Sequence, residues 1–206
     1  MTVTIHPGQA RGTVAAPPSK SMAHRYLIGG ALSAGSTVQR VSGSEDMGAT
    51  LDCLAALGAT VSRQGDTVTL GGADPRRGAA QPLCCRESGS TLRFLIPLCL
   101  LGTEPVTLLG SRRLLQRSLD VYAELCASRG LFFRAEEQSV TVRGPLPAGA
   151  YRVRGDVSSQ FISGLLFALP LLAEDSTLEI IGGLESAAYV DMTLRAMAAF
   201  GVTVQR

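Results

Sequence analysis

Three segments of the chain share one layout, and this repeat constrains the fold more than any other feature. They are residues 19–41, 87–110 and 156–182. Each begins with small polar residues, continues through a mostly apolar run, reaches a turn and enters a β-like stretch. The apolar runs carry too few polar positions for a surface helix, so we expect three buried helices.

Each of these segments is followed by a more amphipathic one, over residues 47–61, 117–133 and 189–204. Gly58, Gly130 and Gly201 lie near their ends, 72 and 71 residues apart. Glycine just past a helical pattern is typical of a helix C-terminus. The spacing predicts repeated α/β units around a pseudo-threefold axis. The alternative is the ordinary alternation of helices and strands found in any α/β protein.

Each unit should close with a β-hairpin. Residues 60–70 place a Gly-Asp turn between alternating strands, and residues 131–144 repeat this with a longer turn. The third unit stops at residues 201–206, so we expect it to be truncated and the chain to be one piece of a longer protein. Pro97 and Pro170 fall inside two apolar runs, which predicts a bend or an early helix end at each.

Composition narrows the class of protein. Hydrophobic residues make up 46% of the 206 residues, charged residues make up 17%, and the net charge is +2. This is typical of a globular protein and does not favour a nucleic-acid or membrane partner. The apolar run over residues 161–173 is too short to span a bilayer. No secretory signal is visible, and five cysteines without a C-x-x-C pair suggest reduced thiols, so we expect a cytoplasmic protein.

The three expected buried helices begin with residues suited to bind an anion. The first opens with Lys20-Ser21, the second with Ser88-Gly89-Ser90, and the third with Ser158-Ser159-Gln160. A helix N-terminus has free N–H groups and a partial positive charge, so it attracts anions. Ser21 and Arg25 are four residues apart and share a helix face. If the three units converge, these N-termini face one cleft.

A purely structural interpretation exists for each of these groups. Serines before an apolar helix are often only N-caps, Arg93 can pair with a buried acid, and Arg117 can be a solvated surface residue. The acids suggest no acid–base pair: we expect Glu45 and Asp46 to cap a helix, and Asp120 and Asp191 to lie on helix surfaces. Two histidines are too few for a zinc site, and no phosphate loop or dinucleotide motif is present.

Four motifs, in order along the chain, resemble the 5-enolpyruvylshikimate-3-phosphate synthase family. They are P-P-S-K-S-x-x-x-R (residues 17–25), G-S-T-x-R (89–93), V-S-S-Q-F (157–161) and E-S-x-x-Y-V-D-M-T (185–193). The UDP-N-acetylglucosamine enolpyruvyl transferases share the fold but normally carry K-N-A where this chain has Lys20-Ser21-Met22.

The resemblance implies an α/β fold of two domains, each built from three βαβαββ units with central helices. It implies transfer of the enolpyruvyl group of phosphoenolpyruvate to the 5-hydroxyl of shikimate 3-phosphate, with release of phosphate, in aromatic amino-acid synthesis. It implies no metal or organic cofactor, and a monomer. By resemblance, residues 1–14 form a strand of the other domain and residues 15–206 form the shikimate-3-phosphate-binding domain. Acid and base groups come largely from the absent second half, so we expect this piece alone to bind substrate without turnover.

The resemblance also implies roles for single residues. Lys20 would be catalytic and, with Gln160, would contact both substrates. The other residues implied to bind shikimate 3-phosphate are Ser21, Arg25, Ser158, Ser159, Ser186 and Tyr189. Gly89 and Arg117 would bind phosphoenolpyruvate, and Ser88, Ser90 and Arg93 would support the second helix N-terminus.

Four positions differ from the commoner family pattern: Glu87, Phe94, Ser118 and Ala187. The first three flank the residues implied to hold phosphoenolpyruvate, so that side of the cleft is the more altered. Two other functions stay open. One is an enolpyruvyl transferase with a different acceptor, and the other is a non-catalytic anion-binding module that kept the fold.

Overall fold

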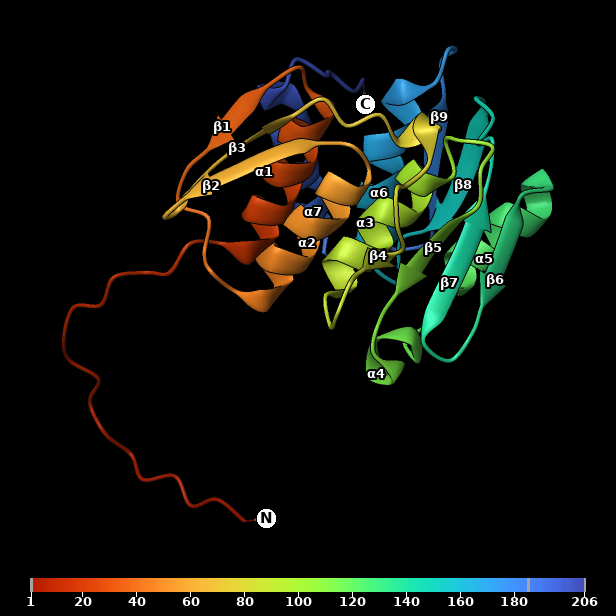
Figure 1. Ribbon diagram of the computed structural model, residues 1–206. Coiled ribbons are helices and arrows are strands. Elements are labelled where there is room, and N and C mark those ends of the chain that lie inside the picture. Colours follow the sequence, from red (N-terminus) through yellow and green to blue (C-terminus); the bar gives the residue numbers. More distant parts are fainter. Residues whose placement is uncertain (1, 185, 206) are drawn as a thin grey trace.

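The structure is a computed structural model that describes residues 2–184 and 186–205. Three similar units follow one another along the chain (Figure 1). The first contains α1 (Lys20–Leu32), β1 (Ser36–Val38), α2 (Glu45–Ala56), β2 (Thr60–Gln64) and β3 (Thr67–Gly71). The second contains β4 (Leu83–Cys84), α3 (Gly89–Cys99), β5 (Val106–Leu109), α4 (Arg112–Leu115), α5 (Asp120–Arg129), β6 (Phe132–Ala135) and β7 (Ser139–Arg143). The third contains β8 (Ala150–Arg154), α6 (Ser159–Ala168), β9 (Thr177–Ile181) and α7 (Ala187–Ala199).

Each unit carries its own small sheet. The strand orders are β1-β3-β2, β4-β5-β7-β6 and β8-β9. The hairpins β2–β3 and β6–β7 are antiparallel, as predicted, with Gln64 opposite Thr67 in the first. The pairs β4–β5 and β8–β9 are parallel, and each is connected through a buried helix. Figure 1 shows the first two sheets on opposite sides of the helices, so the helices fill the centre.

The sequence repeat is therefore a structural repeat, and the predicted fold class is confirmed. Gly58, Gly130 and Gly201 follow α2, α5 and α7 with φ of 91°, 66° and 80°. L-residues with a side chain rarely adopt these angles, and glycine does so without strain.

The central helices α1, α3 and α6 are buried, as their apolar composition predicts. In α3 every residue except Ser90 is buried. The backbones of α3 and α6 come close at Gly164, where an added Cβ would lie 2.5 Å from the carbonyl oxygen of Arg93 and 2.3 Å from Tyr122 Oη. This crossing requires glycine, and it brings the N-termini of the two helices together.

The two prolines act differently. Pro97 lies inside α3, which ends two residues later at Cys99. Proline cannot donate to the carbonyl four residues earlier, and Tyr122 Oη donates to that carbonyl, Arg93 O, at 2.6 Å instead. Pro170 lies beyond the end of α6, in the 3-10 turn η2 (Leu169–Leu171), so that helix does end early. A second such turn, η1 (Pro75–Arg77), connects the first two units.

Residues 2–19 lie outside this body. They are exposed, they form no strand, and they extend away from the helices (Figure 1). The strand that the family resemblance implies for residues 1–14 is thus not formed over residues 2–14 here. Among the helices that the structure describes, none is long and apolar enough to cross a membrane.

Candidate functional site

The three central helices each begin with a serine cap. Ser19 Oγ accepts from Met22 N at 3.3 Å, Ser88 Oγ from Thr91 N at 3.2 Å, and Ser158 Oγ from Gln160 N at 3.2 Å. A single cap satisfies one of the four N–H groups that a helix N-terminus leaves without intrahelical acceptors. The predicted N-termini are therefore real, and each keeps N–H groups that an anion can bind.

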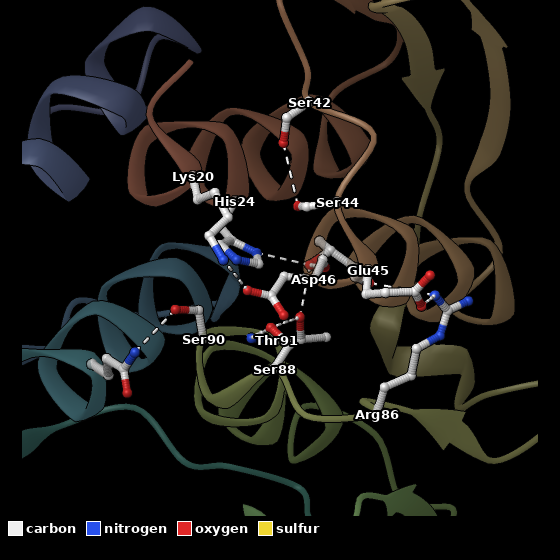
Figure 2. A network of polar contacts seen from close by, with 12 residues as sticks. Lys20, His24, Ser42, Ser44, Glu45, Asp46, Arg86, Ser88, Ser90 and Thr91 are labelled. Carbon is white, nitrogen blue, oxygen red and sulfur yellow. Dashed lines mark hydrogen bonds and ion pairs between the residues drawn. The ribbon is translucent and has the colours of Figure 1, made fainter. Parts of the chain in front are cut away.

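At the N-terminus of α1, Lys20 pairs with an acid from the next helix. Lys20 Nζ lies 2.7 Å from Asp46 Oδ2, and both side chains are partly exposed. The prediction that Glu45 and Asp46 cap α2 is wrong, because Ser44 occupies the cap position and both acids lie in the first helical turn. Glu45 pairs instead with Arg86 at 2.6 Å (Figure 2).

Arg25 joins the first and third units. Its Nε donates to Thr193 Oγ1 at 2.7 Å and its Nη1 donates to Ser21 O at 2.7 Å. Its Nη2 donates to Ser163 Oγ at 3.2 Å and Tyr189 O at 3.1 Å. Among these acceptors none is a carboxylate, so a buried positive charge is held by neutral oxygens next to Ser21.

Burial explains the electrostatics of Arg25. Desolvation lowers the pKa of its guanidinium to about 10, against a smaller opposing effect of Tyr189. The rings of Phe94 and Tyr189 lie 4.9 and 5.9 Å from Arg25 Cζ. Aromatic faces partly offset the lost hydration of a cation. Phe94, one of the four unusual positions, thus packs against this cation.

Gln160 connects the N-termini of α3 and α6. Its Oε1 accepts from Arg93 Nη1 at 3.1 Å, and its Nε2 donates to Ser90 Oγ at 3.0 Å. The structure therefore brings together residues of two motifs that lie far apart in the sequence, G-S-T-x-R and V-S-S-Q-F.

Two guanidinium groups converge on Gly89, the first residue of α3. A Cβ at Gly89 would lie 3.0 Å from Arg93 Nη1 and 3.3 Å from Arg117 Nη1. Arg93 is 7% exposed, its Nη2 donates to Ser118 O at 3.3 Å, and its buried Nε has no hydrogen-bond partner. Within the described residues, neither arginine pairs with a carboxylate.

Burial lowers the pKa of Arg93; Tyr122 opposes this effect, and the nearby Arg117 adds to it. Burial and Arg117 disfavour the charge of Arg93, and a bound anion would favour it. Two guanidinium groups without a carboxylate partner in the described part of the chain, next to a helix N-terminus, are the chemistry that binds a phosphate or carboxylate. Glu87, which would repel such a ligand, is exposed beside this site.

The remaining predicted residues lie around α6 and α7. Ser159 is buried at the start of α6, and Ser158 is half-buried. Tyr189 is exposed on α7, and Ser186 is exposed at its cap position with φ of 60°. Ala187 is the exposed first residue of α7, and Glu185 of the fourth motif lies outside the described residues.

Sequence reasoning missed His24, which it weighed only as a metal ligand. His24 Nδ1 lies 2.8 Å from Thr50 Oγ1, and Thr50 Oγ1 lies 2.7 Å from Thr91 Oγ1. Thr91 in turn bonds the cap Ser88 (Figure 2). The available signal was spacing: His24 follows Lys20 by four residues, as Thr50 follows Asp46. In the described parts of the chain, no group of three or more His, Cys, Asp or Glu residues could hold a metal ion.

The family model of EPSP synthase (3-phosphoshikimate 1-carboxyvinyltransferase) matches residues 5–206. The chain belongs to the EPSP synthase family. Among curated EPSP synthases, it is 43% identical to the 3-phosphoshikimate 1-carboxyvinyltransferase of Clostridium kluyveri over 205 residues, which cover 98% of this chain and 48% of the relative. It is 41% identical to the enzyme of the same name from Clostridium perfringens strain SM101 over 207 residues, 98% of this chain and 49% of that one.

The fold agrees with this family. The structure of EPSP synthase from Acinetobacter baumannii superposes with a TM-score of 0.78 at 23% identity, over 95% of this chain and 45% of that chain. At this identity the likeness shows the fold alone. The chain spans about half the length of the curated EPSP synthases it matches.

Proposed function

We propose that this chain is the shikimate-3-phosphate-binding half of a 3-phosphoshikimate 1-carboxyvinyltransferase. The intact enzyme would transfer the enolpyruvyl group of phosphoenolpyruvate to the 5-hydroxyl of shikimate 3-phosphate and release phosphate. The observation that carries this proposal is that Gln160 joins the capped N-termini of α3 and α6 beside the guanidinium groups of Arg93 and Arg117, while Arg25 holds α1 to α6 and α7. Both substrates are anions, and such N-termini favour anions.

Different residues of the cleft would bind the two substrates. Lys20, at the edge of α1, would reach both substrates and assist the transfer. Ser21 and the α6 residues Ser158 and Ser159 would hold shikimate 3-phosphate, together with Ser186 and Tyr189 from α7. Arg25 would contact the same substrate, and its hydrogen bonds to α6 and α7 fix these groups around it.

Phosphoenolpyruvate would lie at the N-terminus of α3. Gly89 gives its backbone N–H, Arg117 gives a guanidinium group, and Gln160 gives an amide N–H. Arg93 supports them because it holds Gln160 Oε1 and Ser118 O, the carbonyl next to Arg117. Ser88 and Ser90 complete this N-terminus.

We also propose how the intact enzyme is organised. Residues 15–206 would form one domain, residues 1–14 would belong with a second domain, and that second domain would supply the groups that move protons. The enzyme would be a cytoplasmic monomer that needs no cofactor. This chain alone would bind shikimate 3-phosphate and not turn over.

A calorimetric titration of the chain with shikimate 3-phosphate, with shikimate as the control ligand, tests the proposal. We expect binding that requires the phosphate and is lost in Lys20→Ala. Arg143→Ala, at the exposed end of strand β7, removes the same charge outside the residues of the proposed site and should bind normally. A full-length protein that binds neither substrate would contradict the proposal. Equal binding by Lys20→Ala would favour a non-catalytic anion-binding module, and turnover with another acceptor would favour a different enolpyruvyl transferase.

A further inference from the structure

A chain of buried polar side chains runs from α1 through α2 to the N-terminus of α3. It consists of His24, Thr50, Thr91 and Ser88, each no more than 2% exposed. The successive contacts are 2.8 Å for His24 Nδ1 to Thr50 Oγ1, 2.7 Å for Thr50 Oγ1 to Thr91 Oγ1, and 2.7 Å for Thr91 Oγ1 to Ser88 Oγ. Figure 2 shows His24 at one end of this chain and Ser88 at the other.

Counting hydrogens limits how this chain can be arranged. Each hydroxyl carries one hydrogen, and each short contact needs one. Thr50 Oγ1 also lies 3.0 Å from the carbonyl oxygen of Asp46, which can only accept. If Thr91 donates to Ser88, then Thr50 must donate to Thr91, over the shorter distance of 2.7 Å, and not to Asp46 O. Only a hydrogen on His24 Nδ1 can then fill the contact between His24 and Thr50.

In that arrangement the hydroxyl of Ser88 accepts two hydrogen bonds, from Thr91 N and from Thr91 Oγ1. Its own hydrogen stays available to an acceptor at the N-terminus of α3. In the reverse arrangement, Ser88 donates to Thr91, Thr91 donates to Thr50, and Thr50 donates to Asp46 O, so the hydrogen of Ser88 is used. An anion at α3 favours the first arrangement because it needs donors.

The surroundings of His24 suit a neutral imidazole with one donor and one acceptor nitrogen. The pKa of His24 is lowered to about 4, mainly by burial; Asp46 opposes this, and the nearby cations Arg25 and Lys20 add to it. The ring packs edge-on against Phe94, with centroids 6.4 Å apart. A neutral histidine can take either tautomer, and its hydrogen-bond partner selects one.

The same residues align two parts of the proposed site. Lys20 and His24 are one turn apart on α1, and their partners Asp46 and Thr50 are one turn apart on α2. Thr50 then bonds Thr91 on α3. The chain of contacts therefore fixes the place of Lys20 relative to the N-terminus of α3.

We propose that His24, Thr50 and Thr91 are positioning residues, forming a hydrogen-bond relay that starts at His24 Nδ1–H and orients the hydroxyl of Ser88 toward an anion bound at α3. The proposal rests on the proposed function, because it needs phosphoenolpyruvate at that N-terminus. A neutral relay of this kind adds no charge to the site. Its effect is that the hydroxyl hydrogen of Ser88, and not a lone pair of its oxygen, points toward the ligand.

The tautomer of His24 is the first test. The chain has two histidines, so nitrogen NMR of the 206-residue protein labelled with 15N-histidine gives two ring spectra, and His6→Asn assigns them. At pH 7 we expect His24 to carry its hydrogen on Nδ1. A hydrogen on Nε2 would overturn the proposal.

A double-mutant cycle in the full-length protein is the second test. Thr50→Val removes the relay hydroxyl at nearly constant shape, and Ser88→Ala removes its end point. We expect each to weaken phosphoenolpyruvate binding about fivefold to tenfold, and the double variant to be no weaker than Ser88→Ala alone. Thr50→Ser should restore binding. Thr107→Val is the control: it breaks the hydroxyl contact between Thr107 on β5 and Thr141 on β7 and should not change binding.

Additive effects in the double variant would overturn the relay, because Thr50 would then not act through Ser88. Failure of Thr50→Ser to restore binding would overturn it as well. Failure of the proposed function looks different: the unmodified full-length protein would then bind no phosphoenolpyruvate in the first place.

Discussion

Lys20 Nζ lies 2.7 Å from Asp46 Oδ2, so the only lysine of the chain is held by a carboxylate at the edge of the proposed cleft. An anionic substrate that binds Lys20 has to compete with Asp46. Because both side chains are partly exposed, the pair should contribute less than about 1 kcal/mol to stability. The pair therefore matters more for binding than for folding.

Asp46→Asn should strengthen anion binding. The variant removes the competing charge and keeps the shape of the side chain. We expect the affinity for shikimate 3-phosphate to rise about threefold to tenfold at low ionic strength, and less at high salt because of screening. Asp52→Asn is the matched control: it removes the same charge from α2, but Asp52 pairs with Arg86. A loss of affinity specific to Asp46→Asn would show that Asp46 orients Lys20 instead of competing with its ligand.

Gly89→Ala should weaken phosphoenolpyruvate binding while leaving shikimate 3-phosphate binding nearly unchanged. The new methyl group would lie 3.0 Å from Arg93 Nη1 and 3.3 Å from Arg117 Nη1, so both groups must shift. We expect at least a tenfold loss, since two charge-assisted contacts are displaced. Gly35→Ala, where a Cβ meets no atom within 4 Å, is the control. Equal losses for both substrates would place the phosphoenolpyruvate site elsewhere.

Much of the fold was predictable because it depends on local signals. The apolar runs predicted the buried helices, and Gly58, Gly130 and Gly201 marked helix ends where φ must be positive. Hydrogen bonds that depend on contacts between distant parts of the chain were not predictable. That Tyr122 Oη replaces the hydrogen bond lost at Pro97 depends on a contact between Tyr122 on α5 and Arg93 on α3, which are 29 residues apart in the sequence.

In the site, too, local features were predictable from the sequence and long-range contacts were not. The serine caps and the cations near them were visible in the sequence, because capping is a local interaction. The partners of these groups were not: Asp46 reaches Lys20 over 26 positions, and Arg93 meets Gln160 over 67. His24 was missed because the four-residue spacing that it shares with Thr50 becomes informative only once Lys20 is known to pair with Asp46.

Arg25→Met should destabilise the protein strongly. Arg25 is 2% exposed and donates to four oxygens on α1, α6 and α7, and each would lose this charged donor. We expect the free energy of unfolding to fall by about 2–4 kcal/mol in a urea titration. Arg25→Lys should recover little, because one ammonium cannot reach the same set of acceptors. Arg195→Met, exposed on α7, should cost under about 0.5 kcal/mol. Similar losses for the two positions would mean that the Arg25 network adds no stability.

Cys84 should be the only cysteine that reacts quickly with iodoacetamide. It is exposed, whereas Cys53, Cys85, Cys99 and Cys126 are buried. Burial raises the pKa of Cys126 to about 12 and raises that of Cys99, and the contact with Cys53 followed by burial raises the pKa of Cys85. A thiol with a raised pKa has little thiolate to react. Mass spectrometry at pH 8 should show one fast alkylation that disappears in Cys84→Ser. Fast labelling of a second cysteine would contradict the buried thiol environment.

Stability should fall as the pH decreases from about 6.5 to about 4, and His24 should account for part of the loss. Burial lowers the pKa of His24 from 6.5 to about 4, so the unfolded chain binds a proton in this range while the folded chain does not. The free energy of unfolding then decreases with falling pH by up to about 1.4 kcal/mol per pH unit. Above pH 6.5 the imidazole is neutral in both states and contributes no pH dependence.

The matching variant is His24→Phe, which does not titrate and keeps an aromatic ring against Phe94. Urea titrations of both proteins between pH 4 and 8 isolate the contribution of His24, because the carboxylates and the exposed His6 are common to both. We expect the difference in unfolding free energy to be constant above pH 6.5. Below that pH it should shift in favour of His24→Phe, by up to about 3 kcal/mol near pH 4. Parallel curves over the whole range would mean that His24 becomes protonated in the folded protein, and the neutral relay from α1 to α3 would then not exist.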